Sequence, residues 1–253
     1  MRLLLANDDG IYSPGLHALA ECARAFGEVR IFAPDVEQSS TGHAITRSRP
    51  LTIRRTPIGE FEAWRVNGTP ADCTALGINA WTGGVDVVLS GINLGPNLGH
   101  SAWHSGTLAA ARQAAVLGCR GIALSTPTGG TEPDFALLAP YVKQVLELLL
   151  PDPSLKLVNV NLPRQPTGLC WTRLSVRHYD GHVVPGEDPR GRKHYWLTVR
   201  PIEEVDEGTD RWAVRHGLVS ITPLGLDLTD HDRLAQAREA HPVPPPAAET
   251  ATK

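Results

Sequence analysis

The sequence predicts an α/β fold in three layers: a doubly wound, mostly parallel sheet between helices, followed by a β-rich C-terminal arm. Short and mostly apolar runs, such as residues 3–6 and 86–90, are typical of strands buried on both faces. Longer segments between such runs, for example residues 105–117, space their apolar residues as helices do. Strands that alternate with helices in this way form parallel sheets covered on both faces, so these two observations predict the fold class.

The expected elements follow one another regularly up to about residue 165. Strands are expected at residues 3–6, 29–33, 86–90, 121–125 and 157–161, and helices at 14–26, 71–80, 105–117 and 135–150. Ser13 and Pro14 suit the N-cap and first turn of the first helix, and Gly27 is expected to end it. We interpret this stretch as a Rossmann-like core, in which ligands bind beyond the carboxyl ends of the strands.

The composition changes near residue 168. Strand-like runs at 170–176, 195–199 and 212–216 lie among glycine, proline and charged residues, and a short helix is expected at 232–239. We therefore expect one domain over residues 1–241, with the core at about 1–165 and the arm and C-terminal helix at about 166–241. The Pro/Ala/Thr-rich tail at 242–253 is expected to be disordered.

Composition and charge exclude several classes of protein. The formal net charge is −3 without a marked basic run, so a nucleic-acid polymer is not the expected partner. No apolar run approaches the ~20 residues of a membrane span, and the N-terminus has no signal-peptide pattern. We expect a cytoplasmic protein without a membrane partner. Its four cysteines form no C-x-x-C pair and are expected to be separate reduced thiols: Cys22, Cys73, Cys119 and Cys170.

Two adjacent carboxylates, Asp8 and Asp9, come directly after the first expected strand. They repel each other and gain nothing from burial in an apolar core. At a strand end, where Gly10 lets the chain turn, both side chains can reach a hard cation. The alternative is an Asx-turn that leads into the helix after Ser13. We favour the cation site because the pair lies above a predicted parallel sheet.

Three more polar segments follow expected strands or begin a helix. Residues 35–43 supply hydroxyl groups and an imidazole, and residues 90–99 supply asparagines on a glycine-rich path. Residues 104–107 begin a helix, whose free N–H groups favour an anion. Each alone is also compatible with an ordinary loop or helix cap. Carboxylates beside an anion site indicate phosphoryl chemistry, and the lack of P-loop and G-x-G-x-x-G motifs argues against an NTPase or a dinucleotide enzyme.

These segments resemble the SurE (survival protein E) family of 5′/3′-nucleotidases. Seven motifs occur in the family's order between about residues 1 and 235: 7–10, 33–43, 68–73, 90–97, 105–107, 188–197 and 219–224. The resemblance implies a SurE-like version of the fold and hydrolysis of nucleoside monophosphates that depends on a divalent metal. The loop at 129–133 and the proline-rich tail depart from the family pattern.

The resemblance also implies roles for individual residues. It places one divalent cation per subunit, Mg²⁺ or Mn²⁺, on Asp8, Asp9, Ser39 and Asn93. It places phosphate and substrate on Asn7, Asn97, Ser105, Gly106 and Thr107, with Asp227 and His231 on a stretch that the family often carries near its site. It further implies a homodimer or homotetramer that exchanges an arm at residues 180–211.

We therefore expect a metal-dependent phosphomonoesterase that converts nucleoside 5′- and 3′-monophosphates to nucleoside and phosphate by metal-assisted attack of water. Asp8 and Asp9 are its catalytic residues, and the sequence leaves open whether Asp8 is a ligand, a base or a nucleophile. His43 is a candidate acid for the leaving alkoxide, although a histidine bonded to its own Ser/Thr neighbours is the favoured interpretation. The alternative functions are a non-catalytic nucleotide-binding stress module and an aspartyl-phosphate phosphatase, whose D-x-D spacing is absent at Asp8.

Overall fold

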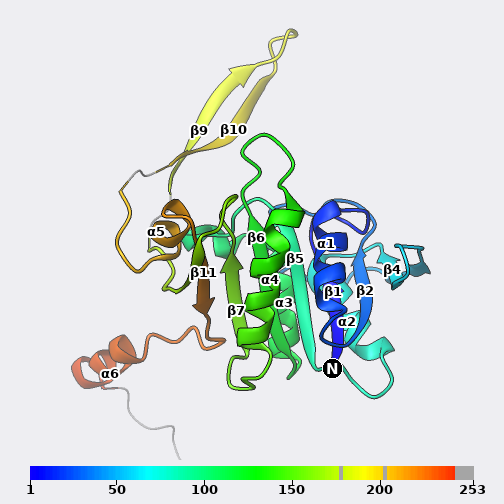
Figure 1. Cartoon of the computed structure of the whole chain (residues 1–253). Coiled ribbons are helices and arrows are strands. Elements are labelled where there is room, and N and C mark those ends of the chain that lie inside the picture. Colours follow the sequence, from blue (N-terminus) through cyan, green and yellow to red (C-terminus); the bar gives the residue numbers. More distant parts are fainter. Residues whose placement is uncertain (177–178, 202–203, 243–253) are drawn as a thin grey trace, which may run out of the picture.

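The computed structural model describes residues 1–176, 179–201 and 204–242, and its centre is a nine-stranded sheet (Figure 1). The strand order is β3-β4-β2-β1-β5-β6-β7-β11-β8. The bounds are β1 (Arg2–Ala6), β2 (Glu28–Pro34), β3 (Ile53–Arg55), β4 (Glu62–Val66), β5 (Val87–Leu94), β6 (Arg120–Thr126), β7 (Leu157–Asn161), β8 (Gly168–Trp171) and β11 (Leu218–Pro223). The strands from β4 to β7 are parallel, whereas β3 and β11 pair antiparallel with β4 and β7.

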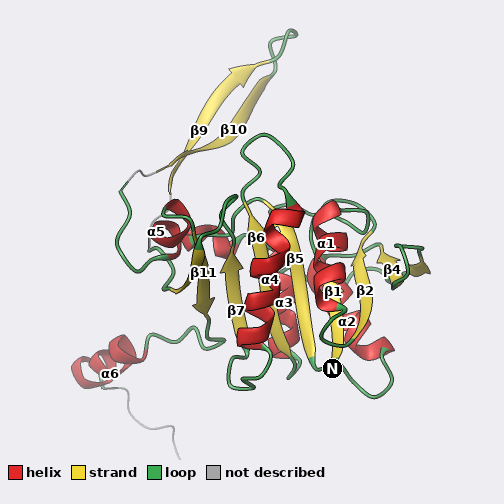
Figure 2. Ribbon diagram, viewed as in Figure 1, coloured by secondary structure: helices red, strands yellow, loops and turns green. Residues whose placement is uncertain are grey.

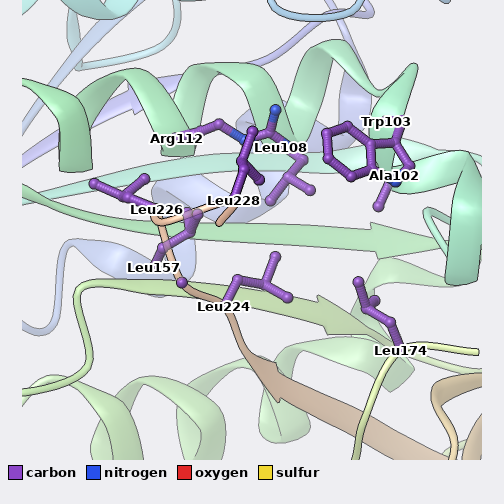
Figure 3. A pocket seen from close by; sticks show the side chains of 10 residues that line it. Ala102, Trp103, Leu108, Arg112, Leu157, Leu174, Leu224, Leu226 and Leu228 are labelled. Carbon is purple, nitrogen blue, oxygen red and sulfur yellow. The ribbon is translucent and has the colours of Figure 1, made fainter. Parts of the chain in front are cut away.

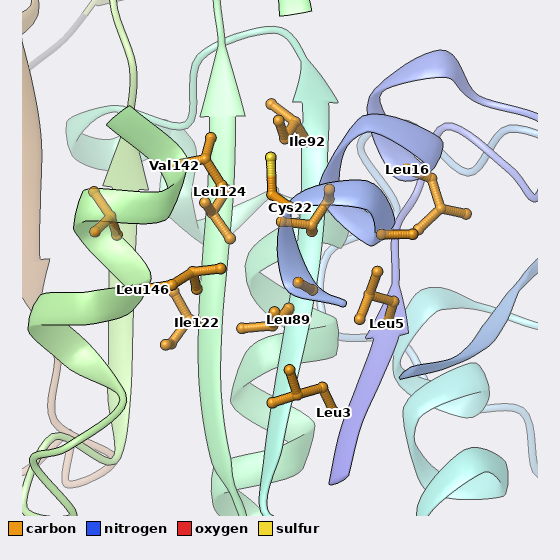
Figure 4. Close-up of a cluster of buried hydrophobic side chains, with 14 of the residues drawn as sticks. Leu3, Leu5, Leu16, Cys22, Leu89, Ile92, Ile122, Leu124, Val142 and Leu146 are labelled. Carbon is orange, nitrogen blue, oxygen red and sulfur yellow. The ribbon is translucent and has the colours of Figure 1, made fainter. Parts of the chain in front are cut away.

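Two pairs of helices cover the two faces of the sheet (Figure 2). One face carries α1 (Pro14–Ala23) and α4 (Phe135–Leu149), and the other carries α2 (Pro70–Ala80) and α3 (Gly106–Val116). Figure 4 shows the larger core cluster, in which Leu5 and Leu89 of the sheet meet Leu16 of α1 and Leu146 of α4. This arrangement confirms the predicted three-layer, doubly wound α/β fold.

The first helix differs in detail from its expected form. Ser13 occupies the N-cap position, but its side chain makes no capping hydrogen bond. The helix ends at Ala23, before the expected stop at Gly27. Gly27 lies instead where the chain turns into β2, and a Cβ added there would lie 2.0 Å from the carbonyl oxygen of Met1. Glycine is required at this position because two backbone segments approach each other closely.

One element was predicted wrongly, and four strands were not predicted: β3, β4, β11 and the strand at Tyr179–Glu187. The strand expected at 212–216 is wrong, because those residues lie in and just after helix α5 (Asp210–Arg215). The hydroxyl of Thr209 accepts a hydrogen bond from the backbone N–H of Trp212 at 3.3 Å. This N-cap stabilises a helix, although the aromatic and branched residues that follow prefer strands. Strands β3 and β4 were missed because their short, charge-rich segments lack an apolar run.

The C-terminal region only partly forms a separate arm. Strands β8 and β11 extend the main sheet, whereas β9 (Tyr179–Glu187) and β10 (Lys193–Pro201) form a hairpin that projects from the body (Figure 1). In the described chain this hairpin pairs with no other strand. The expected C-terminal helix is present as α6 (His231–Ala240), and it has no buried residue. Apart from Pro242, the expected disordered tail at 242–253 lies outside the described residues.

All four cysteines are free thiols, as predicted, and two of them, Cys22 and Cys73, are buried. Burial raises the pKa of both thiols, which makes them poor nucleophiles. Over the described ranges, none of the helices combines the length and the apolar character that crossing a membrane requires.

Candidate active site

The loop that follows β1 brings the two aspartates to the carboxyl edge of the sheet. Within this loop, the Asn7 side-chain amide donates to the Gly10 carbonyl at 2.9 Å, and Gly10 has a φ of +98° that favours glycine. Asn7 is completely buried, so its side chain holds the turn and is not open to a ligand. This contact differs from the Asx-turn considered as an alternative, because the Asn7 amide nitrogen donates and its side-chain oxygen accepts no hydrogen bond from the described residues.

Two adjoining cavities lie at this edge. The first, which we call the Asp8 cavity, has a volume of about 290 Å³ and is lined by Asp8, Ser39, Ser40, Asn93, Leu94, Pro96, Asn97, Ser101, His104 and Ser105. The second, the Asp9 cavity, has a volume of about 460 Å³ and is lined by Asp9, Gly10, Ile11, Tyr12, Ser13, Pro14, Asp35, Val36, Glu37 and Leu94. Three of the four expected metal ligands, Asp8, Ser39 and Asn93, therefore line the Asp8 cavity. The fourth, Asp9, lines the neighbouring cavity, and Leu94 lines both.

Asp8 is held against the first turn of α3. The hydroxyl of Thr107 donates to Asp8 Oδ1 at 2.6 Å, and a Cβ added at Gly106 would lie 2.8 Å from the Asp8 Cβ. Burial raises the pKa of Asp8, and the hydrogen bonds from Thr107 act in the opposite direction. Because Thr107 is completely buried, its side chain positions Asp8 and does not face the cavity.

Among the described residues, no cationic group offsets the charge of Asp9. Its Oδ2 accepts a hydrogen bond from the Leu94 N–H at 3.1 Å. Burial first, and then the charge of Asp8, raise the pKa of Asp9 to about 6, and Glu37 adds to the effect. Two such carboxylates side by side fit a site for a divalent cation, because the cation would supply the missing positive charge.

Ser39 and Asn93 can complete an all-oxygen set of ligands. The Ser39 hydroxyl donates to Glu37 Oε1 at 2.5 Å, and the Asn93 amide nitrogen donates to the Gly95 carbonyl at 2.6 Å. The Ser39 hydroxyl hydrogen and one Asn93 amide hydrogen are thus used within the protein, and the oxygens of both side chains keep lone pairs for another partner. In the described parts of the chain no three His, Cys, Asp or Glu side chains gather as a metal cluster, so neutral oxygens have to complete the set. This donor set suits Mg²⁺ or Mn²⁺.

Asn97 lies in the Asp8 cavity but is bound into a buried polar network. Its amide nitrogen donates to Ser125 Oγ at 2.8 Å and to Thr107 Oγ1 at 3.2 Å, so both amide hydrogens are already used. Its backbone N–H donates to Asn161 Oδ1 at 2.8 Å, and its carbonyl accepts from the Asn159 amide at 2.8 Å. Asn97 therefore supports the Thr107–Asp8 contact, and only its side-chain oxygen is left for a ligand.

Asn159 and Asn161 of β7 are functional candidates that sequence reasoning missed. Both are completely buried in an otherwise apolar strand and face the same side, two residues apart. A buried asparagine is costly unless it is hydrogen-bonded, so two of them in one apolar run are a signal that could have been used.

The histidine at the Asp8 cavity is His104, and His43 lies outside both cavities. His43 Nε2 is 2.8 Å from Gln113 Oε1 on α3. Sequence analysis considered His43 as an acid or as bonded to its Ser/Thr neighbours, and neither interpretation expected Gln113 as its partner. His104 is exposed and precedes Ser105.

Asp227 and His231 do not reach this site within one chain. They bind each other, with 2.6 Å between Asp227 Oδ2 and His231 Nε2. They follow β11, which runs antiparallel to β7, so that Pro223 lies beside Val158 near the start of the parallel strands. In Figure 1, α6 lies toward the end of the sheet at which β1 begins, whereas Asp8 follows the opposite end of β1.

A third cavity of about 160 Å³ is apolar and holds none of the expected site residues (Figure 3). Its walls include Leu108 of α3, Leu157 of β7 and Leu226 and Leu228 of the segment after β11. Arg112 lies at its side, with its guanidinium 5.9 Å from the ring of the exposed Trp103.

Comparisons with known proteins agree with the geometry. Residues 3–181 match the family model of survival protein SurE. A 5′-nucleotidase SurE 1 of Thermus thermophilus is 50% identical over 239 residues, which cover 91% of this chain and 94% of that protein. A 5′-nucleotidase SurE of Deinococcus radiodurans is 41% identical over 95% of this chain and 93% of its own length. The crystal structure of a SurE protein from Aquifex aeolicus superposes with a TM-score of 0.81 at 37% identity, covering 94% of this chain and 98% of the other. This chain belongs to the SurE family.

Proposed function

We propose that the chain is a metal-dependent phosphomonoesterase that hydrolyses nucleoside 5′-monophosphates, and also 3′-monophosphates, to nucleoside and phosphate. The observation that carries the proposal is the pair of carboxylates, Asp8 and Asp9, whose charges are unbalanced beside the first turn of α3. The names of the relatives from Thermus thermophilus and Deinococcus radiodurans support the reaction class. The cytoplasmic location expected from the sequence stays a prediction.

In this proposal Asp8, Asp9, Ser39 and Asn93 hold one Mg²⁺ or Mn²⁺. Such an ion, when bound, offsets phosphate charge and lowers the pKa of a water molecule. The phosphate lies against the N-terminus of α3, where the backbone N–H of Gly106 is not used by the described hydrogen bonds.

Side chains behind and around the cavity orient these groups. Thr107 fixes the direction of Asp8, and Asn97 fixes Thr107. The imidazole of His104 lines the same cavity, so it takes the part of proton donor to the leaving alkoxide that the sequence suggested for His43.

Phosphate release from AMP and 3′-AMP tests this function directly. We expect release by the purified protein to stop in EDTA and to return when Mg²⁺ or Mn²⁺ is added, because the cation lowers the pKa of the attacking water and offsets the charge of the transition state. Release that persists in EDTA would contradict the metal requirement. A folded protein that binds AMP and releases no phosphate with either metal would instead be the nucleotide-binding stress module.

We further propose that the β9–β10 hairpin binds the same hairpin of another copy in a homodimer or homotetramer. The hairpin exposes a strip of apolar side chains on one face, formed by the register partners Val183 (55% accessible) and Leu197 (86%), and it exposes Trp196 (66%) on the other face. A two-stranded hairpin is marginally stable alone in water, and an exposed apolar patch on a projecting element is typical of an interface. The arm that we expected at residues 180–211 includes this strip.

Replacing Leu197 with aspartate should shift the protein from its oligomer to a smaller species, because a charge would be buried at the interface. Light scattering coupled to size-exclusion chromatography measures the masses. Leu137→Asp, which changes an exposed leucine in the first turn of α4, is the matched control and should leave the mass unchanged. A monomeric wild-type protein, or an unchanged Leu197→Asp oligomer, would refute this interface.

A further inference from the structure

Two arginines face each other across the outer strands of the sheet, and neither forms an ion pair with the described residues. Arg54 of β3 and Arg65 of β4 are direct partners in the antiparallel pairing. Like charges in this position destabilise a strand pair. Nearby arginines have acidic partners: Glu62 is 3.9 Å from Arg55 and 2.9 Å from Arg30. For the side chains of Arg54 and Arg65, the described residues provide no hydrogen bond and no ion pair.

The two guanidinium groups line a polar cavity of about 310 Å³, together with Asp35, Thr52 and Asn67. The side-chain oxygen of Asn67 accepts from the Thr52 N–H at 2.8 Å, so the amide nitrogen of Asn67 remains available as a donor. Two arginines against one aspartate leave a net positive charge in this cavity. Planar guanidinium groups beside a free amide donor are the groups that proteins use to bind a phosphate.

This cavity continues the candidate active site along the edge of the sheet. Asp35 lines both the arginine cavity and the Asp9 cavity, and Leu94 lines both the Asp9 cavity and the Asp8 cavity. Strand β4 is separated from β1 only by β2. Two strand spacings amount to about 10 Å, which is on the scale of one nucleotide with a phosphate at each end.

The arginines also lie on the side of the sheet from which the Asp9 cavity opens. Arg65 is the register partner of Ala33, and Ala33 packs in the core cluster under α1. The loop into α1 carries Tyr12, a residue that is 67% exposed and lines the Asp9 cavity. A ligand in the Asp9 cavity could therefore stack a base on Tyr12 and extend past Asp35 toward the arginines.

We propose that Arg54 and Arg65 form a subsite for a second phosphate of the substrate, so that nucleoside 3′,5′-bisphosphates are preferred over monophosphates. The proposal rests on the proposed phosphatase function for the scissile phosphate. In dinucleotide-binding Rossmann folds, whose glycine fingerprint this chain lacks, an acidic residue after the second strand binds a ribose hydroxyl and a nearby arginine accommodates a 2′-phosphate. Asp35 directly follows β2, which is the position of that acidic residue. Arg65 lines the same cavity as Asp35, and so does Asn67, two residues after Arg65.

The hydrolytic step itself is unchanged in this proposal. Water adds to the 5′-phosphorus, the bond between phosphorus and O5′ breaks, and a proton is transferred to O5′. The products are inorganic phosphate and a nucleoside that keeps its 3′-phosphate at the two arginines.

Steady-state kinetics with adenosine 3′,5′-bisphosphate and AMP test the subsite. We expect Arg54→Gln and Arg65→Gln each to lower kcat/KM for the bisphosphate by about tenfold, the effect of losing one charge-assisted hydrogen bond. For AMP the change should stay within about twofold, as for an ordinary surface substitution. Arg55→Gln removes the same charge from the neighbouring position of β3, whose side chain points to the other face, and should change neither substrate. Equal losses for both substrates in the Arg54 and Arg65 variants, or no loss, would overturn the subsite.

Calorimetric titration in EDTA separates this subsite from the proposed reaction, because binding is measured without turnover. The wild-type protein should bind adenosine 3′,5′-bisphosphate more tightly than AMP, and Arg54→Gln should remove the difference. A protein that hydrolyses neither compound but shows this binding difference keeps the subsite and loses the phosphatase. If Arg54→Gln weakens inorganic phosphate but not the bisphosphate, the cavity takes free phosphate, and the substrate assignment is wrong.

Discussion

Replacing Asp9 with asparagine is expected to lower kcat/KM for AMP by roughly three orders of magnitude, because a bound metal stabilises transition-state charge by several kcal/mol and about 1.36 kcal/mol corresponds to tenfold in rate. The substitution is conservative in shape, since the asparagine oxygen can still accept the hydrogen bond from the Leu94 N–H. Initial rates of phosphate release at saturating Mg²⁺ or Mn²⁺ measure the effect. Activity within tenfold of the wild type would show that Asp9 is not part of the catalytic site.

The same variant should be more stable than the wild type when metal is absent. The pKa of Asp9 is raised from 3.8 to about 6, so the fold favours its protonated form, and the wild-type protein loses stability as the pH rises through 6. The asparagine of the variant cannot ionise, so thermal unfolding in EDTA should coincide for both proteins at about pH 3 and favour the variant by up to about 3 kcal/mol at about pH 7.5, since one pKa unit corresponds to about 1.36 kcal/mol. Added metal should raise the Tm of the wild type only. A less stable variant at the higher pH would mean that the carboxylate has a cationic partner.

Replacing Gly106 with alanine should lower kcat by about a hundredfold, because a displacement of about 1 Å in a catalytic group has an effect of this size. The added methyl group would lie 2.8 Å from the Cβ and 2.9 Å from Oδ2 of Asp8, so the carboxylate has to move away from α3. Alanine favours the helical conformation more than glycine does, and the fold itself should therefore be retained.

Kinetics and thermal unfolding of Gly106→Ala separate the two effects. Gly225→Ala is the matched control, because an added Cβ there meets no atom within 4 Å, and it should leave kcat unchanged. If Gly106→Ala retains wild-type kcat, Asp8 has enough freedom to accommodate the methyl group, and its position against α3 does not limit the reaction.

The parallel core could be predicted because strands buried on both faces are continuous apolar runs, as residues 3–6 show. The same signal fails for β3 and β4, which lie at the outer end of the sheet and carry charged residues at several positions. It also fails for α5, where a single capping residue, Thr209, decides between helix and strand. Edge strands and short capped helices depend on few contacts, so a local pattern predicts them poorly.

The candidate site could be predicted where position along a strand was sufficient. Asp8, Asp9 and Asn93 all follow or end strands of the core, so their proximity follows from the topology. The partners of the remaining residues depend on side-chain directions, which the sequence does not show. Gln113 as the partner of His43, and Asn161 as the partner of Asn97, become visible only when strands and helices are placed against each other.

Hydrogen bonds link Asp8 through Thr107 and Asn97 to β7. The site therefore has one half inside this network and one half outside it, and the two halves differ in how readily they open. Backbone groups such as the Asn97 N–H, buried and bonded to Asn161, open only when the central sheet unfolds. The half formed by Ser39 and its loop is exposed, and Ser40 there has a φ of +59°, so it can rearrange while the sheet stays intact. Half of the catalytic geometry is therefore as long-lived as the fold, and exchange of ligands depends on the loop half alone.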